Sequence, residues 1–315
     1  MNSIEVSDLK VSYDGKKYVV DGLSFDVEEG EIFGFLGPNG AGKTTTIRVL
    51  TTLIKPTQGI VNVLGMDVTK RGLEIRKRIG VILQQPSYEW NLSVEKNMYI
   101  YATLWNIPRS QVKKRIDELI EKFDLGEIRK VSAADISIGQ RRRLQLVREL
   151  IHDSELLFLD EPTIGLDPIA RKNLLTYFKS LAKDGTTIFF TTHNLEEADF
   201  LCDRVGIINH GKLFAVDSID NLKASYEGER TIEVMVNRNP RILAGKLKQR
   251  LDHISVEEPV TDDRPLKIIT RKVPETMEII NDFIKEEASS LLWLNVKQTE
   301  LEDVFFKVVG ENRNE

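Results

Sequence analysis

Residues 37–45 read GPNGAGKTT, and this stretch decides the fold that the sequence predicts. The apolar run before it, Ile32–Leu36, predicts a buried strand, and the run after it, Thr45–Leu53, predicts a helix. A glycine-rich loop between a strand and a helix, with the spacing G-x-x-x-x-G-K-[ST], is typical of a loop that binds nucleotide phosphates. The sequence therefore predicts an α/β domain built around a phosphate-binding loop.

The chemistry of a phosphate chain explains the residue types in this loop. Backbone N–H groups must approach the phosphates closely, and glycine permits φ values and contacts that a Cβ would block. The helix that follows points its positive N-terminus at the same place. We expect Lys43 to contact the β- and γ-phosphates and the Thr44 hydroxyl to ligate Mg²⁺. The expected phosphate-binding residues are Gly37, Pro38, Asn39, Gly40, Ala41, Gly42, Lys43, Thr44 and Thr45.

Composition narrows the classes of protein further. The 315 residues suffice for one large domain and a smaller one, and a net charge of −5 provides no general basic field to favour nucleic acid. Cys202 is the one cysteine, so no internal disulfide can form. The N-terminus lacks the apolar core of a signal peptide, and no apolar run approaches the ~20 residues that span a bilayer. We therefore expect the chain to be soluble by itself.

An antiparallel β region is predicted before the loop. Apolar and polar residues alternate in Ile4–Ser12 and again in Tyr18–Val27, which predicts two strands joined by a hairpin. Tyr13 lies at the hairpin tip. Its ring can stack on a nucleobase, but spacing alone favours a half-buried tyrosine at a strand end.

A helical block is predicted at about residues 85–152, inserted into the α/β domain. The predicted helices are Ser93–Ala102, Ser110–Phe123 and Ser137–Ile151, with Ser110 as an N-cap. Strand and helix then alternate again. The predicted strands are Leu156–Leu159, Thr187–Thr191 and Val205–Ile208, and the predicted helices are Pro168–Ala182 and Leu195–Leu201. The expected core is a parallel sheet.

Polar side chains follow three of the predicted buried strands. Asp160 and Glu161 end one strand, where Asp160 can hold Mg²⁺ through water and Glu161 can orient an attacking water. A pair of solvated loop acids is the alternative, which the nearby phosphate loop disfavours. Gln84 ends the predicted strand Ile79–Leu83 and can reach a metal and a water, or can be an ordinary loop residue. His193 can reach a γ-phosphate, although a lone histidine is more often structural.

In this order along the chain, these pieces resemble the nucleotide-binding subunit of an ABC (ATP-binding cassette) transporter. The resemblance covers about residues 4–226 and implies a cassette that binds ATP with Mg²⁺. Residues 37–45 match the family's Walker A motif, and residues 156–160 match its Walker B strand. Residues 165–167 match its D-loop, and Tyr13 matches its base-stacking aromatic. The implied catalytic residues are Glu161, His193, Gln84 and Lys43, and the implied metal ligands are Thr44, Gln84 and Asp160.

The family's signature loop, LSGGQ, is altered in this chain. Residues 136–140 read ISIGQ, so Ser137, Gly139 and Gln140 keep the pattern and Ile138 replaces the first glycine. In the family this loop covers the ATP of a second cassette, which implies two cassettes around two nucleotides. A homodimer is expected, and pairing with a different cassette is the alternative. We expect a working but altered signature, and the alternative is that Ile138 packs against the helical block.

Two further features near the signature remain open. The run Arg141–Arg143 is interpreted as a helix start balanced by nearby acids rather than as a nucleic-acid site. Tyr88 and Trp90 follow the Gln84 loop and are expected to be exposed. They either line a groove that receives a permease helix or pack locally under the helical block.

Residues 227–315 are predicted to form a C-terminal accessory domain after a polar junction. The predicted order of elements is β-α-β-β-α-β-α, typical of a small ferredoxin-like α+β unit, with strands over 231–236, 254–258, 266–270 and 291–296 and a last helix over 301–309. A stabilising appendage and a contact with a second cassette or a permease are the alternatives for its role.

The end of this domain is similar to that of drug-resistance ATP-binding subunits. Residues 301–306, LEDVFF, support this resemblance. It implies a separate integral-membrane permease, export of a drug-like, lipid or other hydrophobic substrate, and a place on the cytoplasmic face of the cell membrane. The alternative is a soluble ABC ATPase with a regulatory or assembly role and no transport.

Overall fold

The computed structural model describes residues 1–225, 230–251, 254–257, 265–287, 289–297, 300–302 and 304–305. The chain divides into two compact units, Met1–Ile219 and Asp220–Glu315. The boundary predicted between residues 226 and 227 falls outside the described residues. Within the described part, no helix is both long and apolar enough to cross a membrane.

A six-stranded sheet forms the centre of the first unit, with the strand order β10-β9-β3-β8-β7-β6. Its strands are β3 (Ile32–Leu36), β6 (Ile79–Ile82), β7 (Leu156–Asp160), β8 (Thr187–Thr192), β9 (Arg204–Asn209) and β10 (Lys212–Ser218). All neighbours pair in parallel except β10, which is antiparallel to β9. Every residue of β3, β7 and β8 is buried, because layers cover both faces of the sheet.

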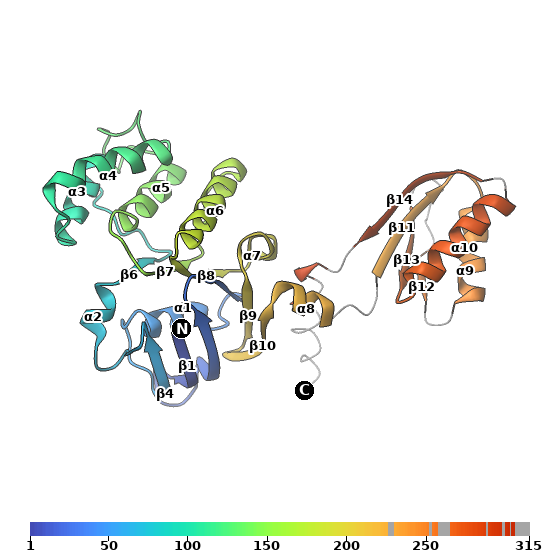
Figure 1. Ribbon diagram of the computed structural model, residues 1–315, viewed down its shortest axis with the longest axis horizontal. Coiled ribbons are helices and arrows are strands. Elements are labelled where there is room, and N and C mark those ends of the chain that lie inside the picture. Colours follow the sequence, from blue (N-terminus) through green and yellow to red (C-terminus); the bar gives the residue numbers. More distant parts are fainter. Residues whose placement is uncertain are drawn as a thin grey trace. The chain divides into compact units, whose positions relative to one another are not determined.

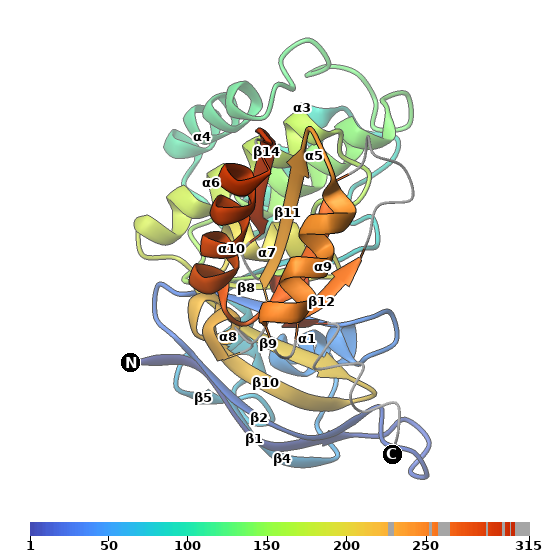
Figure 2. The same ribbon diagram turned by 90° about the vertical axis from the view of Figure 1, so that its right-hand side faces the viewer.

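A second, antiparallel sheet covers one face of the first, together with α1 (Lys43–Leu50). Its order is β2-β1-β4-β5, and its strands are β1 (Asn2–Val11), β2 (Val20–Glu28), β4 (Gln58–Val63) and β5 (Met66–Asp67). Phe25 of β2 stacks on Phe33 of β3 with ring centroids 5.6 Å apart. Figures 1 and 2 both place this sheet and the helical block on opposite sides of the six-stranded sheet.

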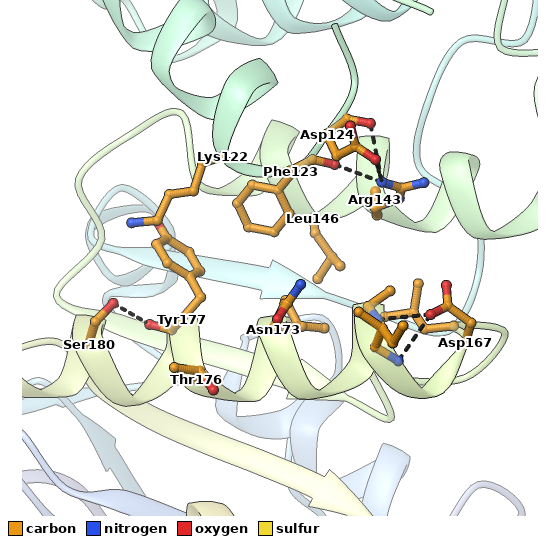
Figure 3. Close-up of a pocket in the computed structure, with 14 residues that line it drawn as sticks. Lys122, Phe123, Asp124, Arg143, Leu146, Asp167, Asn173, Thr176, Tyr177 and Ser180 are labelled. Atoms are coloured by element: carbon orange, nitrogen blue, oxygen red, sulfur yellow. Dashed lines mark hydrogen bonds and ion pairs between the residues drawn. The ribbon is translucent and has the colours of Figure 1, made fainter. Parts of the chain in front are cut away.

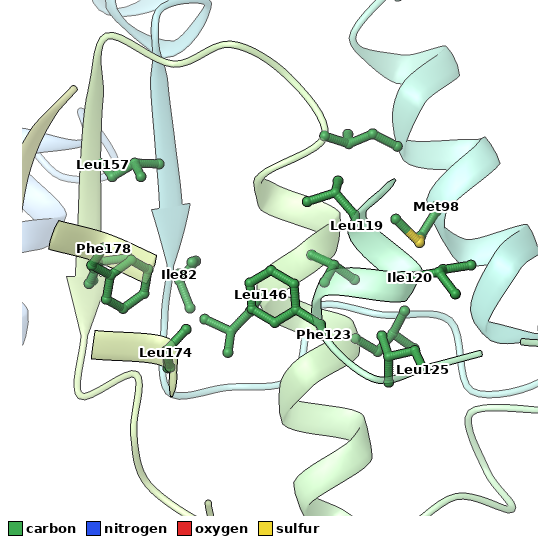
Figure 4. Close-up of a cluster of buried hydrophobic side chains, with 14 of the residues drawn as sticks. Ile82, Met98, Leu119, Ile120, Phe123, Leu125, Leu146, Leu157, Leu174 and Phe178 are labelled. Atoms are coloured by element: carbon green, nitrogen blue, oxygen red, sulfur yellow. The ribbon is translucent and has the colours of Figure 1, made fainter. Parts of the chain in front are cut away.

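Helices cover the other face. They are α3 (Val94–Leu104), α4 (Arg109–Lys122), α5 (Ile138–Glu149), α6 (Pro168–Lys183) and the shorter α7 (Leu195–Leu201), whereas the short α2 (Gly72–Arg76) packs in the other core. Figure 4 shows Leu146 of α5 between Phe123, at the end of α4, and Leu174 of α6. These side chains join the helical block to the sheet through one continuous apolar core.

Two expectations for this unit differ from the structure. Ser110 is not a cap: α4 begins at Arg109, and Pro108 occupies the N-cap position without a side-chain cap. Proline fixes φ and therefore sets the start of the helix before Ser110. The strand β10 was not predicted from the sequence. It forms an antiparallel edge on an otherwise parallel sheet.

In its described residues, the second unit begins with most of α8 (Ile219–Ser225) and continues as a four-stranded antiparallel sheet with the helices α9 and α10. Its elements are β11 (Arg230–Val236), α9 (Pro240–Arg250), β12 (Ser255–Glu257), β13 (Leu266–Thr270), α10 (Val273–Glu286) and β14 (Leu291–Lys297). The strand order is β12-β13-β11-β14. The order β-α-β-β-α-β agrees with the predicted order, and most of the predicted last helix falls outside the described residues.

Candidate functional site

The glycine-rich loop lies between β3 and α1, as the sequence predicts. A Cβ on Gly37 would come within 2.2 Å of the Ile208 carbonyl oxygen on β9, so only glycine fits there. Gly42 has φ 111° and precedes the first residue of α1, Lys43. Glycine adopts this left-handed conformation without strain. The loop therefore turns directly into a helix whose N-terminal amides are available to an anion.

Lys43 directs its ammonium group back into this loop. The Nζ atom donates to the carbonyl oxygens of Gly37 at 2.6 Å and Pro38 at 3.2 Å. It also lies 3.6 Å from Oε1 of Glu161. Burial lowers the pKa of Lys43, while Glu161 and Asp160 act in the opposite direction. The desolvated ammonium attracts a phosphate chain, whereas the two carboxylates repel it unless a cation lies between them and the phosphates.

Asp160 occupies the end of β7 and is 1% exposed. Its Oδ2 accepts a hydrogen bond from the Thr44 hydroxyl at 3.0 Å, and its Oδ1 accepts one from the Thr191 hydroxyl at 2.6 Å. Thr44 and Asp160 therefore present adjacent oxygen atoms, the ligand type that Mg²⁺ prefers.

Gln84 does not contribute to this arrangement of Thr44 and Asp160. Its side chain is exposed and makes no hydrogen bond with Thr44 or Asp160 in the part of the chain that the structure describes. Among the described residues, no cluster of three or more His, Cys, Asp or Glu side chains could hold a metal ion. The oxygen atoms that the structure brings together here are the Thr44 hydroxyl and the Asp160 carboxylate, and Gln84 follows β6 without contacting them among the described residues.

Glu161 and His193 are brought together, although 32 residues separate them. The Oε2 atom of Glu161 lies 2.9 Å from Nδ1 of His193, and Glu161 is 3% exposed. Glu161 has φ 48°, which costs a non-glycine residue about 1–3 kcal/mol. Its N–H donates to the Thr191 carbonyl at 3.1 Å, which helps to hold this conformation. The fold thus orients the Glu161 carboxylate between Lys43 and His193.

Tyr13 lies between β1 and β2 and is 59% exposed, so the interpretation as a half-buried strand-end tyrosine is wrong. Its hydroxyl is 3.3 Å from the hydroxyl of Thr45, at the start of α1. The ring is therefore anchored at the loop and has an exposed surface available for stacking.

The altered signature forms the start of α5. Ser137 and Gln140 make a capping box: the Ser137 hydroxyl accepts from the Gln140 N–H at 3.2 Å, and the Gln140 side chain accepts from the Ser137 N–H at 2.9 Å. Ile138 is 69% exposed and does not pack into the helical block. Its Cγ2 lies 3.5 Å from where a Cβ on Gly165 would be, so its neighbour is the loop after β7.

Arg142 links three parts of the site, and its role was not expected from the sequence. It is 7% exposed and lies in the first half of α5, so the run does belong to the start of a helix, but the Arg142 side chain bonds to backbone carbonyls rather than to the nearby acids. Its guanidinium donates to the carbonyl oxygens of Leu83, Glu161 and Pro162, each at 2.9 Å, and to the Gln145 side chain. Burial lowers the pKa of Arg142 to about 10. The end of β6, the Glu161 backbone and α5 are thereby held together.

We expect Arg142→Met to lower the free energy of unfolding by about 2–4 kcal/mol, because it leaves several buried carbonyl oxygens without their donor. Urea denaturation measures this change. Arg141→Met is the matched control: Arg141 is only partly buried and donates to the Ala134 carbonyl at 3.3 Å, so a much smaller change is expected. Equal destabilisation by the two substitutions would contradict the linking role.

The aromatic pair after Gln84 also differs from expectation. Tyr88 is 8% exposed and packs edge-on against Trp90, with ring centroids 5.2 Å apart, whereas Trp90 is 48% exposed. The expectation that both rings are exposed is therefore wrong for Tyr88, which packs locally. The guanidinium of Arg141 lies 5.1 Å from the centre of the Trp90 ring.

A buried carboxylate beside the histidine loop was also missed. Glu197 of α7 is 4% exposed and accepts from the hydroxyls of Thr163 at 2.9 Å and Thr192 at 3.1 Å. These bonds join the loop that follows Glu161 to the loop that carries His193. Nothing in the sequence distinguishes Glu197 from the neighbouring acidic residues of α7, because one partner lies in the loop after β7 and the other at the end of β8.

Comparison with known proteins agrees with this geometry. The model of the ABC transporter family matches residues 20–164. The chain is 35% identical to the daunorubicin resistance ATP-binding protein DrrA3 of Streptomyces coeruleorubidus, over 95% of this chain and 93% of that protein. It is 36% identical to the bacitracin transport ATP-binding protein BcrA of Bacillus licheniformis, over 98% and 97% of the two chains.

A solved structure is similar to this chain in fold as well as in sequence. The ATP-binding subunit of an ABC transporter aligns with a TM-score of 0.66 and 27% identity, over 71% of this chain and 92% of that one. The Walker-type loop, the Asp160–Glu161 strand end and these relatives define an ATP-binding cassette. The chain belongs to the ABC transporter family, and it is an ATPase of that family.

Proposed function

We propose that this chain hydrolyses ATP as one of two identical cassettes that close around two ATP molecules and drive a separate membrane permease. The observation that carries this proposal is the position of Glu161. Its carboxylate lies 3.6 Å from the Lys43 ammonium and 2.9 Å from Nδ1 of His193. A buried carboxylate held beside the phosphate loop is placed to orient a water molecule for in-line attack on the γ-phosphate.

Nucleotide binding is assigned to the loop and its neighbours. The backbone amides of residues 40–45 and the Lys43 ammonium hold the phosphates, and Tyr13 stacks on the adenine. His193 steadies the γ-phosphate while Glu161 positions the water. The protein contributes positioning and charge neutralisation rather than covalent chemistry.

The residues present also fit Mg²⁺. Thr44 and Asp160 supply adjacent oxygen atoms, joined by a 3.0 Å hydrogen bond, and Gln84 would be the third ligand. When bound with ATP, the ion neutralises charge on the β- and γ-phosphates. Thr191 keeps the Asp160 carboxylate in place by donating to its other oxygen at 2.6 Å.

The partner cassette is expected to be a second copy of this chain. Ser137, Gly139 and Gln140 lie at the N-terminus of α5, where amides and a hydroxyl can cover the γ-phosphate held by the other copy. Ile138 is 69% exposed beside these residues and is free to meet that copy. We also propose that residues 227–315 act as an accessory domain that contacts the second cassette or the permease.

Export is supported by the relatives. Two of them align over more than nine-tenths of both chains and are named for daunorubicin resistance and bacitracin transport. Another, 35% identical over 98% of this chain, is a Nod factor export ATP-binding protein of Ralstonia nicotianae. We propose export of a drug-like, lipid or other hydrophobic substrate, with the chain held on the cytoplasmic face of the membrane by its permease.

Cell fractionation tests the transport proposal. The tagged chain, expressed in its source organism, should collect with the membranes and should co-purify in mild detergent with a multi-span membrane protein. The Glu161→Gln variant should co-purify to the same extent, because its carboxylate lies in the nucleotide site rather than on a docking surface. A chain found only in the soluble fraction, without such a companion, would instead favour an ABC ATPase that regulates or assembles other complexes.

A further inference from the structure

A pocket of about 470 Å³ lies apart from the phosphate loop, between the C-terminal end of α4, the middle of α5 and the length of α6. Figure 3 shows its lining, with Phe123 and Leu146 on the side of the helical block and Asn173 and Tyr177 on α6. Its volume falls in the ~300–1,000 Å³ range of small-molecule sites. None of the residues assigned to ATP hydrolysis lines it.

The apolar part of the pocket is aromatic at one end. The Phe123 ring meets the Tyr177 ring edge-on, with centroids 5.2 Å apart at 86°. Burial raises the pKa of Tyr177 to about 12, so its hydroxyl remains a neutral donor. Leu146 and Leu174 complete the apolar wall. A flat apolar group fits between such surfaces, because rings stack on or abut one another favourably.

Some charged side chains that line the pocket already have a partner within the protein, and one does not have a carboxylate partner. Arg143 pairs with Asp124 at 3.2 Å, and Asp167 accepts from two backbone amides at the start of α6. Lys122 lies 4.0 Å above the centre of the Tyr177 ring. In the described ranges of the chain, it has no carboxylate within 4 Å. Among the described charged groups of the lining, Lys122 is therefore the cation without a carboxylate partner, at the aromatic end of the pocket, while Asp167 keeps its negative charge at the start of α6.

We propose that this pocket binds an aromatic monoanion, with the ring system against Phe123, Leu146 and Tyr177 and the acidic group at Lys122. The walls belong to different parts of the cassette: Phe123 and Leu146 come from the helical block, whereas Leu166 and Tyr177 follow the catalytic strand β7. A bound ligand bridges these parts and resists movement between them. The pocket is thus a regulatory site distinct from the nucleotide site.

A fluorescence titration with 8-anilinonaphthalene-1-sulfonate, an aromatic monoanion, tests this with the full-length chain. One molecule should bind per chain. Lys122→Gln should weaken binding about two- to fivefold, which corresponds to the free energy of one exposed ion pair. Lys122→Arg should restore the affinity, because it restores the positive charge. Thr176→Trp should weaken binding at least tenfold, because Thr176 is exposed, lines the pocket and can fill it without entering the core.

The control is Lys113→Gln, which removes an exposed lysine of the same helix, α4, outside the pocket. It should leave the affinity unchanged. The proposal fails if the wild-type chain does not bind the probe, if Lys113→Gln and Lys122→Gln weaken binding equally, or if Thr176→Trp binds like wild type. If Thr176→Trp does not fold, the three lysine variants alone decide the result.

Discussion

Replacing Glu161 with Gln should reduce ATP hydrolysis by at least a hundredfold while ATP binding is retained. The amide keeps the size of the side chain but loses the negative charge that faces Lys43 at 3.6 Å and His193 at 2.9 Å. A positioned base contributes roughly 10²–10⁴-fold to the rate of such a reaction. The phosphate loop contacts are untouched, so affinity for ATP should change little.

Phosphate release and nucleotide binding measured on the same preparation check this expectation. The matched control is Glu196→Gln, which neutralises an exposed carboxylate on α7. It should hydrolyse ATP at the wild-type rate. Hydrolysis by Glu161→Gln at a rate close to wild type would remove Glu161 from the reaction.

Replacing Lys43 with Ala should weaken ATP binding by about 10- to 100-fold, and hydrolysis should fall with it. Hydrogen bonds to charged groups contribute about 1.5–3 kcal/mol, and each 1.4 kcal/mol is tenfold in affinity. The ammonium is held in the loop by the Gly37 and Pro38 carbonyls, so its position is set before the nucleotide arrives. This preorganisation keeps the entropic cost of binding low.

Equilibrium binding of a fluorescent ATP analogue measures the change. Lys77→Ala, which removes an exposed lysine just after α2, is the control and should bind like wild type. An affinity within about twofold of wild type for Lys43→Ala would show that backbone amides alone hold the phosphates.

The strands that carry the site were predictable because consecutive residues are enough to identify them. β3 is an apolar run, β7 is apolar up to Asp160, and β8 has an apolar centre at residues 188–190 between threonines; each strand is buried along its whole length. The carboxylates Asp160 and Glu161 directly follow such a run, so parallel strands place them at the same edge as the loop. The spacing of glycine and lysine in residues 37–45 is equally local.

The supporting contacts were not predictable, because their partners are distant in sequence. By sequence Arg142 is one of three arginines at a helix start with acids nearby, yet it bonds to Leu83 and Glu161, 59 and 19 residues away. Burial of Tyr88 depends on how the loop folds against Trp90. Helix α4 begins after Pro108, although serine is a better N-cap residue than proline and Ser110 is only two residues further on. A single sequence shows residue types but not which long-range partner they meet.

Sizing of the Glu161→Gln protein with and without ATP tests the central claim most directly. The account predicts a doubling of mass with ATP, because Ser137 and Gly139 of each copy cover the nucleotide held by the other while hydrolysis is blocked. The same experiment with Lys43→Ala should give no doubling. A Glu161→Gln protein that binds ATP and remains a monomer would contradict the claim that this chain pairs with itself around ATP.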